Sequence, residues 1–307
     1  MLNKKKLTKM IKNISVIGSG TMGNGIAHVF AQYDYQVNLI DVNETALNKA
    51  IQTITKNLDR QISKRALTEA QKEKTLKNIS TFTSTAEGVN QADLIVEAAT
   101  ENVELKLNIF KELDGLAPAH AILATNTSSI SITQIAAVSN RGDQVIGMHF
   151  MNPVPVMKLV EVIRGYQTSD ETTKTIMLLA ENLGKSPVEV NDYPGFVANR
   201  ILMPMINEAI YTLYEGVAGV EEIDTVMKLG MAHPMGPLQL ADFIGLDVCL
   251  AILKVLQEGF GNPKYAPCPL LVNMVVAGKK GAKTGEGFYK YTAGSKDLYV
   301  ADKFKKS

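Results

Sequence analysis

A histidine and a glutamate, twelve positions apart, have the residue types and the setting of an acid–base pair. Of the four histidines, only His149 ends an apolar run, VIGMH, with the character of a buried strand. Glu161 lies inside a second such run, KLVEVI, where an unpaired carboxylate would be costly. A reversal of the chain between Pro153 and Pro155 would bring the two side chains together. Because a carboxylate orients an imidazole and stabilises its charged form, we predict that His149 is a general base.

A glycine-rich segment near the start of the chain has the spacing of a phosphate-binding turn. The sequence Gly18-Ser19-Gly20-Thr21-Met22-Gly23 follows the apolar run ISVI and opens a helical segment. Gly18 allows the tight turn, Gly20 lets the backbone approach a pyrophosphate, and Gly23 lets the helix pack closely on the strand. The N–H groups at the helix start, with the positive end of its dipole, then face the phosphates. These residues, Thr21 and Met22 included, form the predicted dinucleotide site.

An acidic residue distinguishes between the two nicotinamide cofactors. Asp41 ends a further apolar run, QVNLI, 18 residues after Gly23. A carboxylate in this place accepts hydrogen bonds from the ribose hydroxyls and repels a 2′-phosphate. No arginine follows Asp41, and Glu44 adds another negative charge. The sequence therefore predicts NAD, and not NADP, as the cofactor.

The elements that must position these residues follow an alternating pattern. Strand-like apolar runs occur at 13–18, 36–41, 92–98, 121–125, 144–150 and 157–163, and helical segments such as 22–32, 44–62 and 103–116 lie between them. Alternation of this kind predicts an α/β fold, a Rossmann-type doubly wound sheet covered by helices on both faces.

After Pro194 the strand-like runs end and helical periodicity takes over. The helical segments are 195–214, 220–228, 238–260 and 269–277, and Gly and Pro punctuate them where helices stop or start. We therefore expect an NAD-binding domain over 1–193 and an all-helical C-terminal domain over 194–307. The basic first ten residues are expected to be a leader before the first strand. The polar tail after residue 292 is expected to be loosely attached.

Composition excludes several classes of protein. The 32 Lys+Arg residues balance 31 Asp+Glu, so no global charge favours nucleic acid or an anionic membrane. No segment is long and apolar enough for a membrane span or a signal peptide. The two cysteines, Cys249 and Cys268, form no CxxC motif and are expected to be thiols of a reduced cytoplasm. We expect a cytoplasmic protein with no metal centre.

The chain resembles one dehydrogenase family over about residues 12–291. The segment from His149 to Glu161, HFMNPVPVMKLVE, is similar to the signature of the L-3-hydroxyacyl-CoA dehydrogenases, which include the 3-hydroxybutyryl-CoA dehydrogenases. Further family motifs are GSGTMGNGIA (18–27), EAATENVELK (97–106), TNTSSISI (125–132), PGFVANRIL (194–202), GPLQLADFIGLD (236–247) and KTGEGFYKY (283–291). Met151 departs from the family pattern, which usually has an aromatic residue there.

The resemblance implies roles for particular residues. It makes His149 the base that removes the proton of the 3-hydroxyl group, with Glu161 as its partner. Ser128 would hydrogen-bond the 3-oxygen, and Asn199 would hold the reacting groups from the second domain. Glu101, Lys106, Asn152 and Lys283 match positions that border NAD, and Lys64 matches one that meets CoA. Alternatives remain open for three of these: Ser128 caps a helix beginning near Ile130, Asn199 links helices, or Lys64 is a solvated surface charge.

The implied reaction is the reversible NAD-dependent oxidation of a (3S)-3-hydroxyacyl-CoA to a 3-oxoacyl-CoA, with short acyl chains favoured. The resemblance also implies a monofunctional enzyme and a homodimer paired through its helical domains, for which the apolar stretch 201–214 is either a surface or part of the core. One alternative is a related dehydrogenase of a sugar acid such as gulonate. Another is a binding protein that keeps the NAD fold without catalysis. The choice between β-oxidation and short-chain fermentation stays open.

Overall fold

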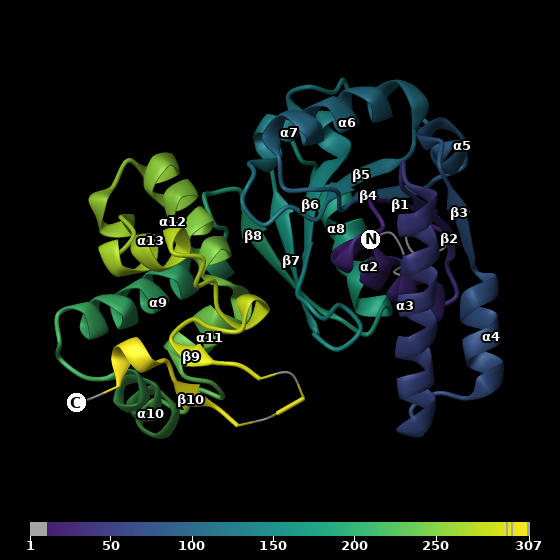
Figure 1. The fold of residues 1–307 in the computed structure, drawn as a ribbon. Helices are drawn as coiled ribbons and strands as arrows, with labels where there is room; N and C mark the ends of the chain where they lie inside the picture. Colours follow the sequence, from purple (N-terminus) through teal and green to yellow (C-terminus); the bar gives the residue numbers. More distant parts are fainter. Residues whose placement is uncertain (1–10, 293, 296, 306–307) are drawn as a thin grey trace. The chain divides into compact units, whose positions relative to one another are not determined.

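The computed structural model describes residues 11–292, 294–295 and 297–305, and it divides the chain into two compact units (Figure 1). The first unit ends at Tyr193 and the second begins at Pro194. The basic leader expected over the first ten residues lies outside the described residues. None of the helices in these described ranges is long and apolar enough to cross a membrane.

The first unit is built on an eight-stranded sheet with the order β3-β2-β1-β4-β5-β6-β7-β8. Neighbouring strands in the described sheet run parallel, except that β6 and β7 are antiparallel. The strands are β1 (Asn13–Ile17), β2 (Gln36–Ile40), β3 (Ile79–Phe82), β4 (Leu94–Glu97), β5 (Ile122–Thr125), β6 (Val145–Phe150), β7 (Leu159–Arg164) and β8 (Ser186–Asn191). The strand order reverses direction at β1 and β4, where doubly wound sheets bind ligands. The Rossmann-type prediction is confirmed.

Helices cover both faces of this sheet (Figure 1). They are α2 (Thr21–Gln32), α3 (Glu44–Ser63), α4 (Glu69–Lys77), α5 (Thr85–Val89), α6 (Val103–Leu116), α7 (Ile132–Ala136) and α8 (Asp170–Asn182). Side chains of α2 and α8, among them Phe30 and Ile176, pack with sheet residues such as Val16 and Val162 into one buried core. Asparagine side chains cap the N-termini of two of the helices. Asn43 accepts a hydrogen bond from the Ala46 N–H in α3, and Asn102 accepts one from the Leu105 N–H in α6. Such caps satisfy backbone donors that have no partner within the helix.

The second unit is helical, as predicted, with its own core. Its helices are α9 (Ala198–Tyr214), α10 (Val220–Gly230), α11 (Pro237–Ile244), α12 (Leu246–Phe260) and α13 (Pro269–Val276). The single helix expected over 238–260 is wrong, because the chain breaks at Gly245. That residue has φ of 103°, a backbone conformation that side-chain-bearing residues rarely adopt, and it both ends α11 and begins α12. Cys249 and Cys268 are buried and form no disulfide.

The described part of the tail over 297–305 is packed against this unit, whereas the sequence was expected to be loosely attached there. The short strand β10 (Tyr299–Val300) pairs antiparallel with β9 (Tyr289–Lys290). The ring of Phe304 lies 5.7 Å from the ring of the fully buried Phe288, measured between centroids. Lysines surround these residues in the sequence and indicate an exposed segment. For that reason neither the apolar contact nor the strand pairing was predicted.

Candidate active site

The antiparallel pairing of β6 and β7 brings His149 and Glu161 together. The two residues are direct partners in the strand register, so their side chains leave the sheet on the same face. His149 Nδ1 lies 2.9 Å from Glu161 Oε2, with His149 9% exposed and Glu161 2% exposed. Because an ionised carboxylate only accepts hydrogen bonds, this contact puts the imidazole hydrogen on Nδ1 and leaves Nε2 able to take a proton.

The reversal between these strands is held in place by its own backbone. The N–H groups of Val156 and Met157 both donate to the Pro153 carbonyl oxygen, each at 3.0 Å. The Lys185 ammonium donates to the Met157 carbonyl oxygen at 2.8 Å. On the neighbouring side, the Phe150 N–H donates to Asn126 Oδ1 at 2.9 Å, which ties the end of β6 to the loop after β5. The end of the strand that carries His149 is therefore fixed from both directions.

Ser128 lies in that loop after β5. Its N–H donates to Glu101 Oε1 at 3.0 Å, and its hydroxyl lies 3.4 Å from the same oxygen. The alternative that Ser128 caps the following helix is wrong, because Ser131 does so by accepting from the Gln134 N–H. The position of Ser128 is thus set by a carboxylate from the loop after β4.

Glu101 and Lys106, both expected to border NAD, contact each other in the structure. Lys106 is 1% exposed, and its ammonium lies 2.6 Å from Glu97 Oε1 and 3.4 Å from Glu101 Oε2. Burial alone would raise the pKa of Glu101. The Lys106 charge and the hydrogen bonds from residues 127–129 outweigh the effect of burial and lower the pKa of Glu101. Glu101 is therefore held in its charged form.

The glycine loop has the geometry of a dinucleotide site. Gly18 has φ of 94°, and a Cβ built on Gly23 would lie 1.7 Å from the Gly18 carbonyl oxygen, so neither position tolerates a side chain. A Cβ built on Gly20 would meet no heavy atom within 4 Å, which leaves room there for a ligand. Gly20 is also the N-cap of α2 and has no side chain to cap it. The exposed helix start and the open space beside it fit a pyrophosphate.

Asp41 follows β2 and is oriented by the same loop. Its Oδ2 accepts hydrogen bonds from the Ser19 N–H at 2.8 Å and the Ser19 hydroxyl at 2.7 Å. Its Oδ1 accepts from the Asn43 N–H at 3.1 Å. A carboxylate offers about four acceptor directions, so one direction on Oδ1 remains for a ribose hydroxyl. The arrangement fits NAD.

A cavity of about 420 Å³ opens beside the glycine loop. It is lined from three sides of the first unit: Ser19, Gly20, Thr21, Asn24 and Gly25 around the start of α2; Ala46, Lys49, Ala50, Thr53 and Asn57 on α3; and Asn152, Pro153, Val154 and Pro155 in the reversal after β6. Asn152, which the resemblance implies borders NAD, is among the lining residues, and its role stays a prediction. Lys49, Thr53 and Asn57 were missed by sequence reasoning. Their spacing of four residues, which places them on one face of a helix, was the available signal.

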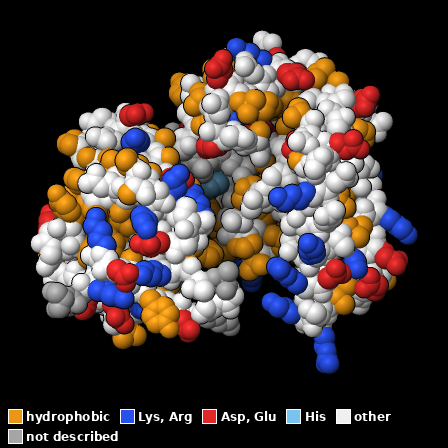
Figure 2. All heavy atoms as spheres, viewed as in Figure 1, with side chains coloured by type: hydrophobic (Ala, Val, Ile, Leu, Met, Phe, Trp, Pro, Cys, Tyr) orange, Lys and Arg blue, Asp and Glu red, His pale blue; other side chains and the backbone are white. Residues whose placement is uncertain are grey.

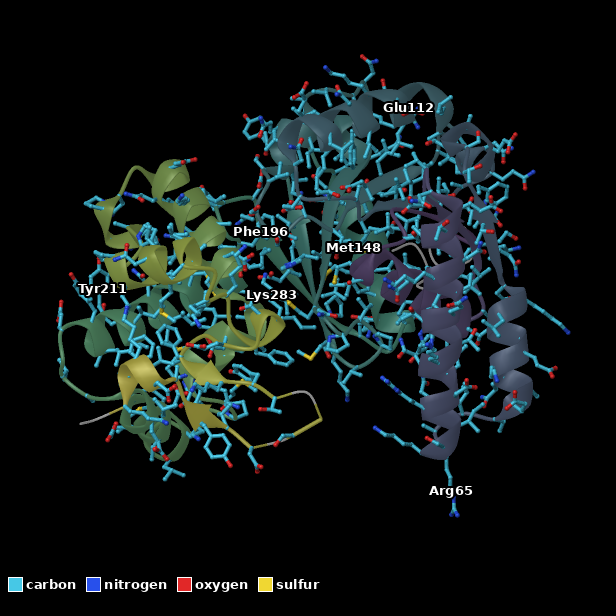
Figure 3. The ribbon with its side chains drawn as sticks, in the orientation of Figure 1. Arg65, Glu112, Met148, Phe196, Tyr211 and Lys283 are labelled. Carbon is cyan, nitrogen blue, oxygen red and sulfur yellow. The ribbon has the colours of Figure 1, made fainter. Side chains whose placement is uncertain are left out.

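Lys64 lies elsewhere on α3. It is the exposed C-cap residue of that helix, outside the cavity lining. Arg65 follows it and points away from the unit (Figure 3). Figure 2 shows Lys and Arg side chains (blue) over α3, where Lys49, Lys56, Arg60 and Lys64 are exposed. Their spacing of seven, four and four residues puts all four on one side of the helix.

Two expected site residues belong to the second unit. Asn199 lies in the first turn of α9, and its N–H donates to the Gly195 carbonyl oxygen at 3.1 Å. Lys283 lies in the 3₁₀ turn Ala282–Thr284, and its ammonium lies 2.5 Å from Asp247 Oδ1. Their expected roles toward NAD and substrate stay predictions.

Comparison with known proteins places these features in a family. Residues 13–193 match the NAD binding domain of 3-hydroxyacyl-CoA dehydrogenase, and residues 195–291 match its C-terminal domain. A probable 3-hydroxybutyryl-CoA dehydrogenase of Bacillus subtilis is 56% identical over 92% of this chain and 98% of its own. The mitochondrial hydroxyacyl-coenzyme A dehydrogenase of Rattus norvegicus is 46% identical over 92% of both chains. The crystal structure of (S)-3-hydroxybutyryl-CoA dehydrogenase from Ralstonia eutropha is similar, with a TM-score of 0.89 and 51% identity over 92% of this chain and 99% of that one.

Proposed function

The chain belongs to the 3-hydroxyacyl-CoA dehydrogenase family, and we propose that His149 is the general base of its reaction, with Glu161 as its partner. The protein is an NAD-dependent oxidoreductase that oxidises short-chain (3S)-3-hydroxyacyl-CoA reversibly to 3-oxoacyl-CoA. The contact of 2.9 Å between the buried His149 and Glu161 side chains is the observation that supports the proposed roles.

Proton transfer follows from the tautomer that this contact selects. His149 Nε2 takes the proton of the 3-hydroxyl group, and the resulting imidazolium is stabilised by Glu161 across the Nδ1 hydrogen bond. NAD, when bound, would supply the acceptor for the hydride of C3. Ser128 holds the 3-oxygen by a hydrogen bond, and Asn199 is proposed to hold the reacting groups from the second unit.

The cofactor is NAD, and its proposed contacts follow from the loop geometry. The start of α2, from Gly20 to Gly23, meets the pyrophosphate, while Asp41 receives the adenosine ribose. Glu101, Asn152 and Lys283 are proposed to border the cofactor as the family pattern implies. Lys106 is proposed to do so too, from a position in which its ammonium also contacts Glu97.

The phosphates of CoA need local cations, because the chain's formal net charge is only +1. We propose that the exposed basic side of α3, which runs from Lys49 beside the cavity to Lys64 at the helix end, meets them.

A homodimer in the cytoplasm is proposed for the assembled enzyme. The stretch 201–214 divides between core and surface: Met203, Ile206 and Ile210 are buried, whereas Ile201 is 67% exposed. Large apolar side chains are also exposed on and beside α10, including Leu229. Apolar surface of this kind suits a subunit contact. Light scattering coupled to size-exclusion chromatography tests it, and a mass near the 33.4 kDa of one chain would contradict the dimer.

The proposed roles are tested by following NADH oxidation with acetoacetyl-CoA and, for the competing substrate class, NAD reduction with gulonate. The unaltered protein is expected to turn over acetoacetyl-CoA. His149→Gln is expected to lower kcat by about 10²–10⁴-fold while NADH binding, measured by its fluorescence, is kept. A His149→Gln variant with unchanged kcat would show that another group is the base, and turnover of gulonate alone would reassign the substrate.

A further inference from the structure

Two fully buried charges lie outside the proton-transfer pair. Glu97 ends β4 and is 0% exposed, and Lys106 on α6 is 1% exposed. Their charged atoms lie 2.6 Å apart. A buried ion pair contributes little net stability, because desolvation offsets the attraction, and apolar residues of similar volume often serve as well. Their presence beside the loop that carries Ser128 therefore points to a task other than folding.

The pair belongs to a closed ring of contacts. Glu97 Oε2 accepts from the Thr125 hydroxyl at 2.7 Å, and Thr125 Oγ1 accepts from the Thr127 N–H at 3.2 Å. The Thr127 hydroxyl donates to Glu101 Oε1 at 2.5 Å. The Lys106 ammonium completes the ring by contacting both Glu101 Oε2 and Glu97 Oε1. The ring joins the ends of β4 and β5 to the first turn of α6.

Ser128 and the two residues after it are hydrogen-bonded to members of this ring. Glu101 Oε1 accepts from the Ser128 N–H and from the Ser129 hydroxyl, each at 3.0 Å. Thr127 Oγ1 accepts from the Ile130 N–H, also at 3.0 Å. Thr127 itself is 0% exposed, so its hydroxyl has no access to a substrate. The backbone on either side of Ser128 is therefore set by Glu101 together with Thr127, which is itself too buried to touch the reacting atoms.

We propose that Thr127, Lys106 and Glu97 are positioning residues, which fix Ser128 by holding Glu101. The proposal rests on the proposed role of Ser128 at the 3-oxygen. The lowered pKa of Glu101 agrees with it, since only the charged carboxylate accepts hydrogen bonds from all its donors.

A double-mutant cycle between Thr127 and Ser128 tests this. Thr127→Val removes one hydroxyl and keeps the side-chain shape. Since a misplacement of 1 Å at a reacting group can cost about 10²-fold, we expect kcat for acetoacetyl-CoA to fall about 10–100-fold. In the Ser128→Ala background the same change should add no further loss. Thr127→Ser, which restores the hydroxyl, should recover the rate. Thr173→Val is the matched control, because that buried hydroxyl donates only within α8, to the Ser169 carbonyl oxygen.

A second variant tests the role of Lys106. Lys106→Met alone would leave Glu97 buried without its partner, so Glu97→Gln is combined with it to keep the site neutral. The double variant should lose kcat about as Thr127→Val does. Full turnover at saturating NADH and acetoacetyl-CoA would overturn the proposal. A Thr127→Val variant with normal kcat would also overturn the proposal, if Ser128→Ala has a lowered kcat. If Ser128→Ala itself turns over normally, the proposed role of Ser128 fails, and the positioning role fails with it.

Discussion

Replacement of Glu161 by glutamine tests whether His149 and Glu161 work as a unit. The amide keeps the size of the side chain and removes its charge. A hydrogen bond to a charged group contributes about 1.5–3 kcal/mol and a neutral one about 0.5–1.5 kcal/mol. The difference, about 1–1.5 kcal/mol, corresponds to a change in rate of about 5–13-fold. Because Glu161 is 2% exposed, water cannot replace the lost charge, so Glu161→Gln should lower kcat by about this factor.

The assay is a cycle of His149→Gln, Glu161→Gln and the double variant, measured as single-turnover oxidation of NADH by acetoacetyl-CoA. Glu161 acts only through the imidazole, so the double variant should be about as slow as His149→Gln alone. Glu189→Gln on the neighbouring strand β8 is the control, because its exposed carboxylate pairs with Arg164 and should leave kcat unchanged. Losses that multiply in the double variant would refute the coupling of the two residues.

Three further outcomes are expected. Asp41→Ala should narrow the preference for NADH over NADPH in kcat/KM, and equal use of both by the unaltered protein would mean that the ribose contact is misassigned. Lys64→Ala should raise KM for acetoacetyl-CoA and leave kcat and KM for NADH unchanged; no effect on a full CoA thioester would make Lys64 a solvated surface charge. Burial lowers the pKa of His28 from 6.5 to about 4, so the unfolded chain binds more protons between these pH values. The free energy of unfolding should therefore fall by about 2 kcal/mol between pH 6.5 and 5. Urea denaturation should show that His28→Gln loses this part of the pH dependence, and an identical dependence in both proteins would contradict the assignment.

The central strands were predictable from the sequence and the edge strands were not. The runs that became β1, β2 and β4 to β7 are β-branched and buried on both faces, a pattern with a strong signal. Strand β3 (ISTF) has no fully buried residue, and β8 begins with Ser186-Pro187 and is largely exposed. Helix α4 (EAQKEKTLK) buries only Thr75. Such elements are held by neighbours that a single sequence does not reveal.

The candidate site shows the same division. The meeting of His149 and Glu161 could be predicted, because one reversal in a short segment accounts for it. The ring around Lys106 was missed, since it joins residues from the ends of β4 and β5, whose adjacency appears only in the folded sheet. One signal was nevertheless present. Glu97 stands inside the apolar run ADLIVEA as Glu161 stands inside KLVEVI, and the argument that a carboxylate there needs a partner applies equally to both.

The antiparallel register of β6 and β7 has a consequence for insertions and deletions. Side chains alternate between the two faces of a sheet. A shift of β7 by one residue along β6 would therefore place Val160 or Val162 opposite His149, and the Glu161 carboxylate would lie on the other face of the sheet. A residue added within 151–158 can instead be absorbed as a longer connection, provided that the pairing of the strands is kept. The pairing of His149 with Glu161 thus depends on the register between β6 and β7 and not on the number of residues that separate the two in the sequence. Single-residue insertions placed in turn within 151–158 and within β7 should accordingly differ sharply in their effect on activity.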